Sequence, residues 1–457
     1  MKKKSILNNC NHLQFQLVFL IIIINNLQVF SSSYYINSNK GSDLNQGSIL
    51  SSWKTMNPLQ NKIFKPGDKI FFARNGEYSG GFTVNGEGTE DEPISICAYG
   101  TGTPPVLTNP DYDFLNGNVI QVRAAFVQVE DLKFAHTAAC TLIDPVNVED
   151  YWKNKSIRTR IDKKVLLVGA IYQTSEAKSL TVRNCEFEDC PIAIYLNGKD
   201  NLVDGNYIHD CNRVLWDPLW GPMAIVIANS NIEISNNKCI NYKREGGTFG
   251  ADGGFIELDS RYSGGDIHDI YIHHNFSQAN EGFIEITNSG SNLNISYNIS
   301  DDYQQFAFFW EGDNSRIENN TIIRTRPANS SVNVVFTFKN DGYIVRNNIL
   351  VLSDSLQVFA GGAYGVKNFN QLHENNLYFV PSGNNNNPIG QPVGEGEIIG
   401  NPLFRNFKKS DFRLQSKSPA IDAGKDLGYK FDFLWKPLPS GKSADIGAFE
   451  YMKNNDK

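Results

Sequence analysis

The sequence lacks several features that would place it quickly in a functional class. It has seven cysteines in 457 residues, and none of them forms a Cys-x-x-Cys pair, which argues against the common zinc and thioredoxin-like motifs. After Ile24 no apolar run approaches the ~20 residues that a membrane-spanning helix needs. Leucine does not recur at fixed offsets and helical segments are missing, so the chain is not a leucine-rich repeat.

Basic residues are fewer than acidic ones, 42 against 49, and three of them lie in a segment that we expect to be removed. Residues 1–33 combine a basic start at Lys2–Lys4, an apolar stretch at Leu17–Ile24 and small residues at Ser31–Ser33, which is the layout of a secretory signal peptide. Removing them takes away three lysines and no acid, so the net charge goes from −7 to −10. We therefore expect a secreted protein, and this charge argues against nucleic acid or an anionic membrane as its partner.

The cysteines beyond the signal leave two alternatives open. They are Cys97, Cys140, Cys185, Cys190, Cys211 and Cys239. Secretion permits disulfides, and Cys190 and Cys211 occupy equivalent places in successive repeats of the pattern described below. Stacked repeats ~4.8 Å apart lie within the ~4.4–6.8 Å Cα range of a disulfide. The residues admit either a disulfide between these two or a stack of reduced thiols in the core.

The sequence does contain a repeated phrase, which is clearest in residues 253–312. A short apolar strand is followed by a Gly/Asn/Ser turn, a second alternating strand and an asparagine, three times over. Across the chain an apolar anchor recurs at steps as short as 21, 22 and 23 residues, a period typical of a solenoid. The anchors are Val129, Val182, Val203, Ile234, Ile272, Ile295, Ile317, Val345 and Leu372, and the third residues after them, from Val182 on, are Cys185, Asn206, Asn237, Asn275, Asn298, Asn320, Asn348 and Asn375.

Asparagine at one fixed place in each repeat has a mechanical explanation. Asparagine tolerates the left-handed backbone of a tight turn, and its amide can bond the asparagine one repeat away to form an internal ladder. We therefore predict an all-β fold, a single-stranded right-handed parallel β-helix over residues 34–451, followed by a tail at 452–457. Residues 34–120 form the N-terminal cap and first coils, 121–380 the central coils and 381–451 the C-terminal cap. A short helix near residues 53–61 is predicted to cover the open end, before a strand at Lys69–Ala73.

Carboxylates gather on one face of the predicted coils. In the first strand of each coil, the pattern predicts one inward-pointing apolar pair. The pairs are Ile194/Leu196, Ile225/Ile227, Ile256/Leu258, Ile284/Ile286, Phe308/Trp310 and Phe336/Phe338. Alternation then sends Glu257, Asp259, Glu285 and Glu311 outward. Glu257 falls directly on Glu285 one coil away, whereas Asp259 and Glu311 fall in a neighbouring column two coils, or just under ~10 Å, apart.

This arrangement predicts acid–base chemistry on a glycosidic bond. Two carboxylates about 5 Å apart do not ionise together cheaply, so one pKa should rise and provide a general acid. The spacings approach both the ~5–5.5 Å of retaining and the ~6.5–9.5 Å of inverting glycosidases. We favour inversion, with Glu257 or Glu285 as proton donor and Asp259 or Glu311 activating water. The alternative is a row of solvated surface acids without a catalytic role.

Insertions between coils are expected to collect on the binding face. They occupy residues 144–164, 211–223, 243–252 and 361–370. Two of them are rich in glycine and aromatic residues, and Trp220 and Phe249 are predicted to stack on sugar rings. Asp252, Arg261 and Lys339 complete the predicted substrate-binding set.

No metal ligand set is predicted, and His273 and His274 are interpreted as structural. Of six glycosylation sequons, Asn275 and Asn298 fall on the ladder and should stay unmodified, whereas Asn154 and Asn329 are candidate acceptors.

Both ends of the mature chain resemble a known superfamily. The entry YYINSNKGSDLNQGS…FKPGDKIFFARNGEY and the tail motifs DFRL (411–414), SPAID (418–422) and DIGA (445–448) are similar to those of secreted right-handed β-helix proteins of the pectin-lyase-like superfamily. With the coils, the resemblance covers nearly the whole mature chain and implies a carbohydrate-active type of protein. It does not specify a reaction, because lyases, glycoside hydrolases, epimerases and adhesins share this fold.

The layout GFIEI…GSNLNISYN…GDNSRIENN also resembles β-helical alginate and chondroitin lyases, in which a lysine and an arginine act as base and acid beside calcium. Here the corresponding segments, 286–289 and 309–311, carry neither. We therefore expect a monomeric, secreted glycoside hydrolase acting on a neutral or weakly charged polysaccharide, with no cofactor. The alternatives are a uronate-cleaving lyase that would use Lys339 or Arg261 and calcium, and a non-catalytic glycan-binding adhesin or cell-wall protein.

Overall fold

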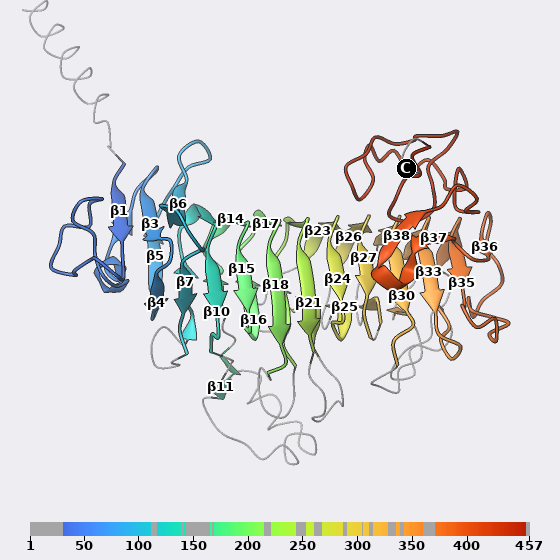
Figure 1. Cartoon of the computed structure of the whole chain (residues 1–457), viewed down its shortest axis with the longest axis horizontal. Helices are drawn as coiled ribbons and strands as arrows, with labels where there is room; N and C mark the ends of the chain where they lie inside the picture. Colours follow the sequence, from blue (N-terminus) through green and yellow to red (C-terminus); the bar gives the residue numbers. More distant parts are fainter. Residues whose placement is uncertain are drawn as a thin grey trace, which may run out of the picture.

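The computed structural model of the chain is an elongated tube in which the backbone winds through three long sheets (Figure 1). It describes residues 31–110, 117–138, 141–142, 165–166, 169–213, 221–243, 253–259, 267–286, 290–303, 305–309, 314–327, 335–338, 342–359 and 371–453. Most of the predicted signal and most of the predicted insertions lie outside these residues. In the described part, no helix is long and apolar enough to span a membrane.

Sheet 1 has twelve parallel strands, one from each successive coil. They are β1 (Ser33–Ile36), β3 (Lys69–Ala73), β6 (Ile94–Tyr99), β9 (Ala125–Glu130), β14 (Lys178–Arg183), β17 (Asn201–Asp204), β20 (Ile232–Ser235), β23 (His268–His273), β26 (Ser291–Ser296), β29 (Arg316–Glu318), β32 (Ile344–Arg346) and β34 (Leu372–Glu374).

Sheet 2 follows sheet 1 in each coil from β3 onward and also has twelve parallel strands. They are β4 (Glu77–Ser79), β7 (Val106–Thr108), β10 (Lys133–Ala135), β15 (Glu186–Glu188), β18 (Tyr207–Cys211), β21 (Lys238–Tyr242), β24 (Phe276–Gln278), β27 (Ile299–Asp301), β30 (Thr321–Arg324), β33 (Ile349–Leu352), β35 (Leu377–Phe379) and β36 (Ile398–Ile399).

Sheet 3 completes each coil with ten parallel strands. They are β2 (Ile63–Phe64), β5 (Phe82–Gly86), β8 (Ile120–Val122), β13 (Ile171–Gln173), β16 (Ile192–Leu196), β19 (Met223–Ile227), β22 (Gly254–Leu258), β25 (Gly282–Ile286), β28 (Ala307–Phe309) and β31 (Phe336–Phe338). Two antiparallel pairs lie apart from the three sheets: β11 (Thr141–Leu142) with β12 (Val165–Leu166), and β37 (Phe404–Asn406) with β38 (Asp411–Leu414). The right-handed parallel β-helix predicted from the repeat is confirmed.

The predicted anchors form one column of sheet 1. Val129, Val182, Val203, Ile234, Ile272, Ile295, Ile317 and Val345 pair in register from coil to coil, and all are buried. The last predicted anchor, Leu372, is wrong by one residue, because it pairs with Ile344 and is half exposed. His373 takes the anchor place instead, where its ring packs 4.9 Å from Phe359.

The asparagine ladder is present, and the described coils show how it works. Each ladder residue from Asn206 to Asn348 donates its backbone N–H to the side-chain oxygen of the next one, over 2.9–3.0 Å. The last member is Asn376 rather than the predicted Asn375, and it donates its side-chain amide to Glu397, which ends the ladder. Positive φ falls on the residue before the ladder asparagine, as at Asn236, so the turn and the ladder are two different residues.

The cysteines are free thiols among the described residues. Cys190 and Cys211 lie two positions beyond Glu188 and His209, which pair in register, so their equivalence in successive coils is confirmed. Both are buried and neither is in a disulfide. Burial raises the pKa of the Cys190 thiol to about 12. Of the two alternatives, the stack of reduced thiols is the one observed; Cys140 lies outside the described residues.

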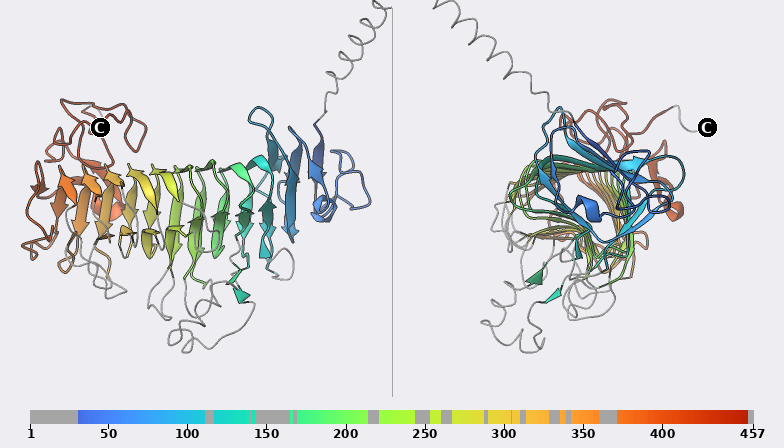
Figure 2. Two further views of the ribbon diagram at one scale, coloured as in Figure 1. Left: turned by 180° about the vertical axis from the view of Figure 1, so that it is seen from behind. Right: turned by 90° about the vertical axis from the view of Figure 1, so that its left-hand side faces the viewer.

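The N-terminal end of the tube is covered, and the C-terminal segment packs along its side. At the N-terminal end the predicted helix is a single 3-10 turn, η1 (Asn57–Leu59), which lies across the mouth of the tube and buries Leu59 (Figure 2). At the other end, the C-terminal segment runs back along the outside. Its hairpin β37–β38, with the short 3-10 turn η4 (Phe407–Lys409), packs on the outer face of sheet 2, burying Phe412 against residues such as Ile323 and Val351.

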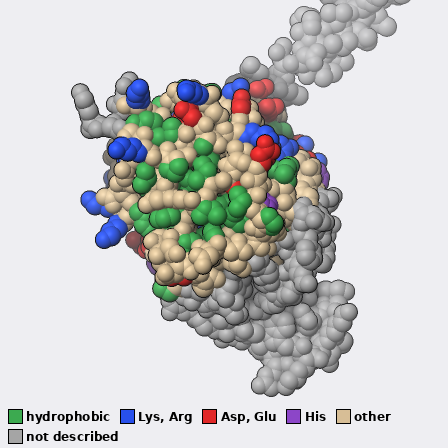
Figure 3. Space-filling model, turned by 90° about the vertical axis from the view of Figure 1, so that its right-hand side faces the viewer, with side chains coloured by type: hydrophobic (Ala, Val, Ile, Leu, Met, Phe, Trp, Pro, Cys, Tyr) green, Lys and Arg blue, Asp and Glu red, His purple; other side chains and the backbone are tan. Residues whose placement is uncertain are grey.

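The C-terminal end of the tube exposes many hydrophobic side chains (Figure 3). Hydrophobic side chains gather across this end, with Lys and Arg toward its edge (Figure 3). Leu372 on β34 and Ile399 on β36, the last described strands of sheets 1 and 2, are about half exposed.

Candidate functional site

The two glutamates on which the predicted site depends are neighbours on sheet 3. Strand β22 pairs with β25 so that Glu257 is directly opposite Glu285. The residues on either side, Ile256 with Ile284 and Leu258 with Ile286, are buried in the core, so alternation turns both carboxylates outward. Two glutamates that are 28 positions apart in sequence therefore face one wall on adjacent coils.

Asp259 continues the same face just after β22. Its backbone N–H donates to the carbonyl of Ile227 in the preceding coil, over 2.8 Å, so it keeps the register of the sheet. Its side chain is 2% exposed and that of Glu257 is 9% exposed, whereas Glu285 is half-buried. Aspartate and glutamate are almost never fully buried unless they are paired. The burial of two of these three carboxylates argues against the alternative of a solvated acidic row.

The predicted register is wrong at the next coil. Strand β28 pairs with β25 so that Ala307 lies opposite Ile284, and Phe308 opposite Glu285. Ala307, which is buried, therefore takes the inward position that was predicted for Phe308, and Trp310 lies outside the described residues. A small residue fits at position 307 because the stacked rings of Phe283 and Phe306, 4.6 Å apart, already fill this part of the core.

The column that joined Asp259 to Glu311 was built on that wrong register, so its predicted spacing has no support. Glu311 lies outside the described residues. So do all five predicted substrate-binding residues, namely Asp252, Trp220, Phe249, Arg261 and Lys339. Of the predicted site, the structure brings together Glu257, Asp259 and Glu285.

Two tyrosines missed by the sequence reasoning as site residues share the outward column of Glu257. Tyr172 pairs with Tyr195, which pairs with Val226, which pairs with Glu257. The two rings lie 5.1 Å apart. Burial raises the pKa of the Tyr172 phenol, so it stays a neutral hydrogen-bonding group. The alternation of Ile171, Tyr172 and Gln173 was the signal that would have found it. Along this column, the two tyrosines are followed by the apolar Val226 and then by the two glutamates.

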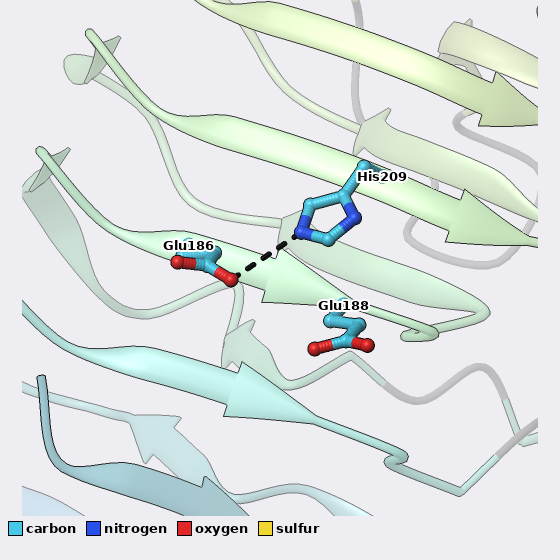
Figure 4. A group of neighbouring side chains, drawn as sticks. All are labelled: Glu186, Glu188 and His209. Atoms are coloured by element: carbon cyan, nitrogen blue, oxygen red, sulfur yellow. Dashed lines mark hydrogen bonds and ion pairs between the residues drawn. The ribbon is translucent and has the colours of Figure 1, made fainter. Parts of the chain in front are cut away.

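A second group of acids lies on the outer face of sheet 2, where Glu186, Glu188 and His209 point toward one another (Figure 4). Lys133 fills the position a cation would take, with its Nζ 2.7 Å from Glu186 and 2.6 Å from Glu188. The hydrogen bond from Lys133 lowers the pKa of Glu188. His209 bonds Asp210 through Nδ1, over 2.8 Å. The group is a closed ion-pair network and does not extend the acidic face of sheet 3.

His274, the residue after β23, contacts the C-terminal segment. His274 is 9% exposed and stacks on Trp435 with ring centroids 4.1 Å apart. Its Nε2 donates to the carbonyl of Asp432, over 3.0 Å. Burial, with the neighbouring His273, lowers the pKa of His274 to about 4. These contacts agree with the structural interpretation of this residue.

Comparisons with known proteins identify the fold. No protein-family model matches the chain, and no curated protein matches its sequence. The solved structure of XylC in complex with xylose has a TM-score of 0.56 at 12% identity, covering 92% of this chain and 98% of its own. A rhamnogalacturonan lyase has a TM-score of 0.51 at 11% identity, covering 83% and 92%. At such identities the likeness concerns architecture, so the chain is similar to these proteins in its right-handed parallel β-helix fold.

Proposed function

We propose that the protein is a secreted polysaccharide-degrading enzyme, an inverting glycoside hydrolase that acts at the acidic face of sheet 3. The observation that supports this most is the in-register pair of Glu257 and Glu285, with Asp259 buried beside it. The proposal keeps Glu285 or Glu257 as proton donor and Asp259 as the base. Glu311, the other predicted base, has no support from the observed register.

The spacing of the described acids suits inversion. Asp259 and Glu285 are one coil (~4.8 Å) and two residues (~6.6 Å) apart on one face, which puts their Cα atoms roughly 8 Å from each other. Inverting enzymes hold their two carboxyl groups ~6.5–9.5 Å apart, leaving room for a water molecule, and side chains that extend from Cα atoms this far apart can reach that separation. Glu257 and Glu285, at ~4.8 Å, are too close for that, and like-charge repulsion favours a proton on one of them.

The proposed reaction is a single displacement. The protonated glutamate gives its proton to the glycosidic oxygen as the bond from that oxygen to the anomeric carbon breaks. Asp259 takes a proton from water while the water oxygen attacks the anomeric carbon from the opposite face. The products are two hydroxyl-terminated sugars, and the two carboxyl groups have exchanged their protonation states.

Amide substitutions test this proposal. Glu257→Gln, Asp259→Asn and Glu285→Gln keep the shape of each side chain and remove its ability to exchange a proton. We expect the purified mature protein to cleave a member of a polysaccharide panel, and Asp259→Asn and Glu285→Gln to lower kcat by about 10²- to 10⁴-fold. Reducing ends measure the rate, and NMR of the first product measures the anomeric configuration. Glu395→Gln, an exposed glutamate of the C-terminal segment, is the matched control.

Full activity in all three amide variants would end the assignment. The same assay separates the two other functions. A lyase would release unsaturated products that absorb in the ultraviolet, a result the rhamnogalacturonan lyase likeness makes worth measuring. A glycan-binding protein would retain the polysaccharide without cutting it, and its affinity would not depend on Asp259 or Glu285.

A further inference from the structure

A separate groove lies on sheet 2, away from the acidic face of sheet 3. It is formed where the edge of the C-terminal segment crosses the outer face of the sheet, and its volume is about 560 Å³. One wall comes from strands β21, β24, β27 and β30, and the other from the turn between β37 and β38. Specific small-molecule sites have volumes of roughly 300–1,000 Å³, so the groove is large enough to hold a sugar residue.

The wall on the sheet carries an ordered set of polar side chains. Asp301 accepts hydrogen bonds from Arg326 Nη2 over 2.8 Å and from Gln278 Nε2 over 3.1 Å. Gln278 also donates to Ser410 Oγ on the opposite wall, over 3.1 Å. The guanidinium of Arg326 lies 5.4 Å from the centre of the Tyr303 ring. These contacts fix the planar groups before any ligand arrives, which lowers the entropy cost of binding.

The charges that line the groove do not cancel. Arg326 and Lys408 are positive and Asp301 is negative, so the lining carries one net positive charge. Asp301 is already paired with Arg326, whereas the exposed Lys408 makes no ion pair with any residue the structure describes. The chain as a whole has a net charge of −7. A locally positive groove on an acidic protein favours a ligand that carries negative charge.

The opposite wall adds an aromatic surface. Phe407 is 39% exposed, and its ring is held by Phe404 and Phe412, with centroids 6.2 Å and 6.0 Å away. A sugar ring presents C–H groups on one face and hydroxyls at its edge, so it suits a groove with an aromatic ring on one side and amide, guanidinium and hydroxyl groups on the other. Among the described residues that line the groove, Asp301 is the only carboxylate, and it is held by Arg326, so this described lining does not provide the pair of acids that hydrolysis needs.

We propose that this groove binds an anionic sugar residue of a polysaccharide without cleaving it. Lys408 meets the negative charge, Phe407 packs against the sugar ring, and Gln278 and Arg326 bond its hydroxyls. The charge can come from a uronic carboxylate or from a sulfate ester. The proposal does not depend on the reaction at Glu257, Asp259 and Glu285.

Calorimetric titration of the full mature protein tests the proposal with defined probes. These are a galacturonic acid trimer, the same trimer with its carboxyls methyl-esterified, and a sulfated galactose trimer. We expect saturable binding of at least one anionic trimer, at least tenfold weaker binding of the neutral ester, and weakening in high salt. A preference for the first or third probe identifies carboxylate or sulfate as the source of charge.

Two surface variants locate the binding. Lys408→Gln should weaken the anionic trimer about fivefold and Phe407→Ala about tenfold, whereas Lys409→Gln, the adjacent exposed lysine outside the groove, should leave affinity unchanged. Arg326→Ala is avoided because it would leave Asp301 unpaired. Equal loss in Lys408→Gln and Lys409→Gln, equal affinity for the ester, or no binding of any anionic probe would overturn the proposal. Loss of binding in Glu285→Gln would overturn it too, because the probe would then occupy the acidic face.

Discussion

Asp259 and Glu285 show how a solenoid turns sequence distance into a short, fixed spacing. They come from different coils, yet the pairing of β22 with β25 fixes one relative to the other through backbone hydrogen bonds. A carboxylate pair set by the sheet needs no loop to position it. The groups that would contact the substrate, in contrast, were predicted mostly on insertions. At the scale of single residues, the structure therefore places the three carboxylates, whereas the predicted substrate-binding residues lie outside the described part of the chain.

The ladder residue Asn298 supports the first stability prediction. It is fully buried, its side-chain amide donates to the side-chain oxygen of Asn320 and to the carbonyl of Ile272, and its side-chain oxygen accepts from the backbone N–H of Asn275. Asn298→Ala removes these bonds and leaves buried backbone groups unpaired, at a cost of ~1–3 kcal/mol for each such group. We expect the free energy of unfolding to fall by about 3 kcal/mol, measured by urea denaturation. Asn384→Ala, at an exposed loop position, should change it by less than ~0.5 kcal/mol.

At the scale of elements, the contact between β23 and the C-terminal segment should depend on pH. His274 Nε2 faces the carbonyl of Asp432 and therefore carries the proton, so Nδ1 accepts from His273, over 2.9 Å. His273 in turn faces Glu233, at 3.2 Å. A proton added to His274 would set two donors against each other. Burial, and then the neighbouring His273, lower the pKa of His274 from the usual 6.5 to about 4.

The sign of the effect follows from the lowered pKa. The unfolded chain binds this proton below pH 6.5 and the folded chain only below about pH 4, so stability present at pH 7 is lost between these values, by roughly 3 kcal/mol. We expect wild-type protein to lose that much more stability than His274→Phe between pH 7 and pH 4.5 in urea denaturation. His136→Phe, at a more exposed histidine that also has a positive φ, is the control. Equal pH dependence of wild type and His274→Phe would contradict the prediction.

Strands β28 and β34 show where sequence patterns stop being sufficient. Periodicity and turn asparagines predicted the coils, and strict alternation predicted the pairing of Glu257 with Glu285. Around residues 306–310 the apolar run FAFFW allows either phase of alternation, and only the pairing with β25 selects Ala307 as inward. At β34 a histidine, and not the adjacent leucine, points inward because Glu397 bonds its ring. In both places the local sequence allows two choices of inward residue, and a contact with a residue distant in sequence decides between them.

At the scale of the whole molecule, the largest feature that no repeat could predict is the course of the C-terminal segment. It has no period, and its contacts join residues far apart in sequence, such as Phe412 and Ile323 on sheet 2. It also creates the groove at Arg326 and Lys408, which neither the segment nor the sheet would form alone. The coils thus provide a repetitive frame, and the non-repetitive segment adds a groove to one side of it.

The absence of disulfides among the described cysteines leads to a prediction about the folded molecule as a whole. Cys185, Cys190, Cys211 and Cys239 are buried, and burial raises the pKa of Cys185 and Cys190 to about 12, so these thiols are neither accessible nor ionised at neutral pH. We expect iodoacetamide at pH 8 to leave all four unmodified in the native protein and to alkylate all four after unfolding in urea, as measured by peptide mass spectrometry. Cys97, which is only partly buried, serves as the internal comparison.

A reductant should leave the unfolding midpoint unchanged, because no bond between these coils depends on oxidation. Protection of Cys190 and Cys211 in unfolded protein that reductant abolishes would instead reveal a disulfide between them, and the stack of free thiols would be wrong.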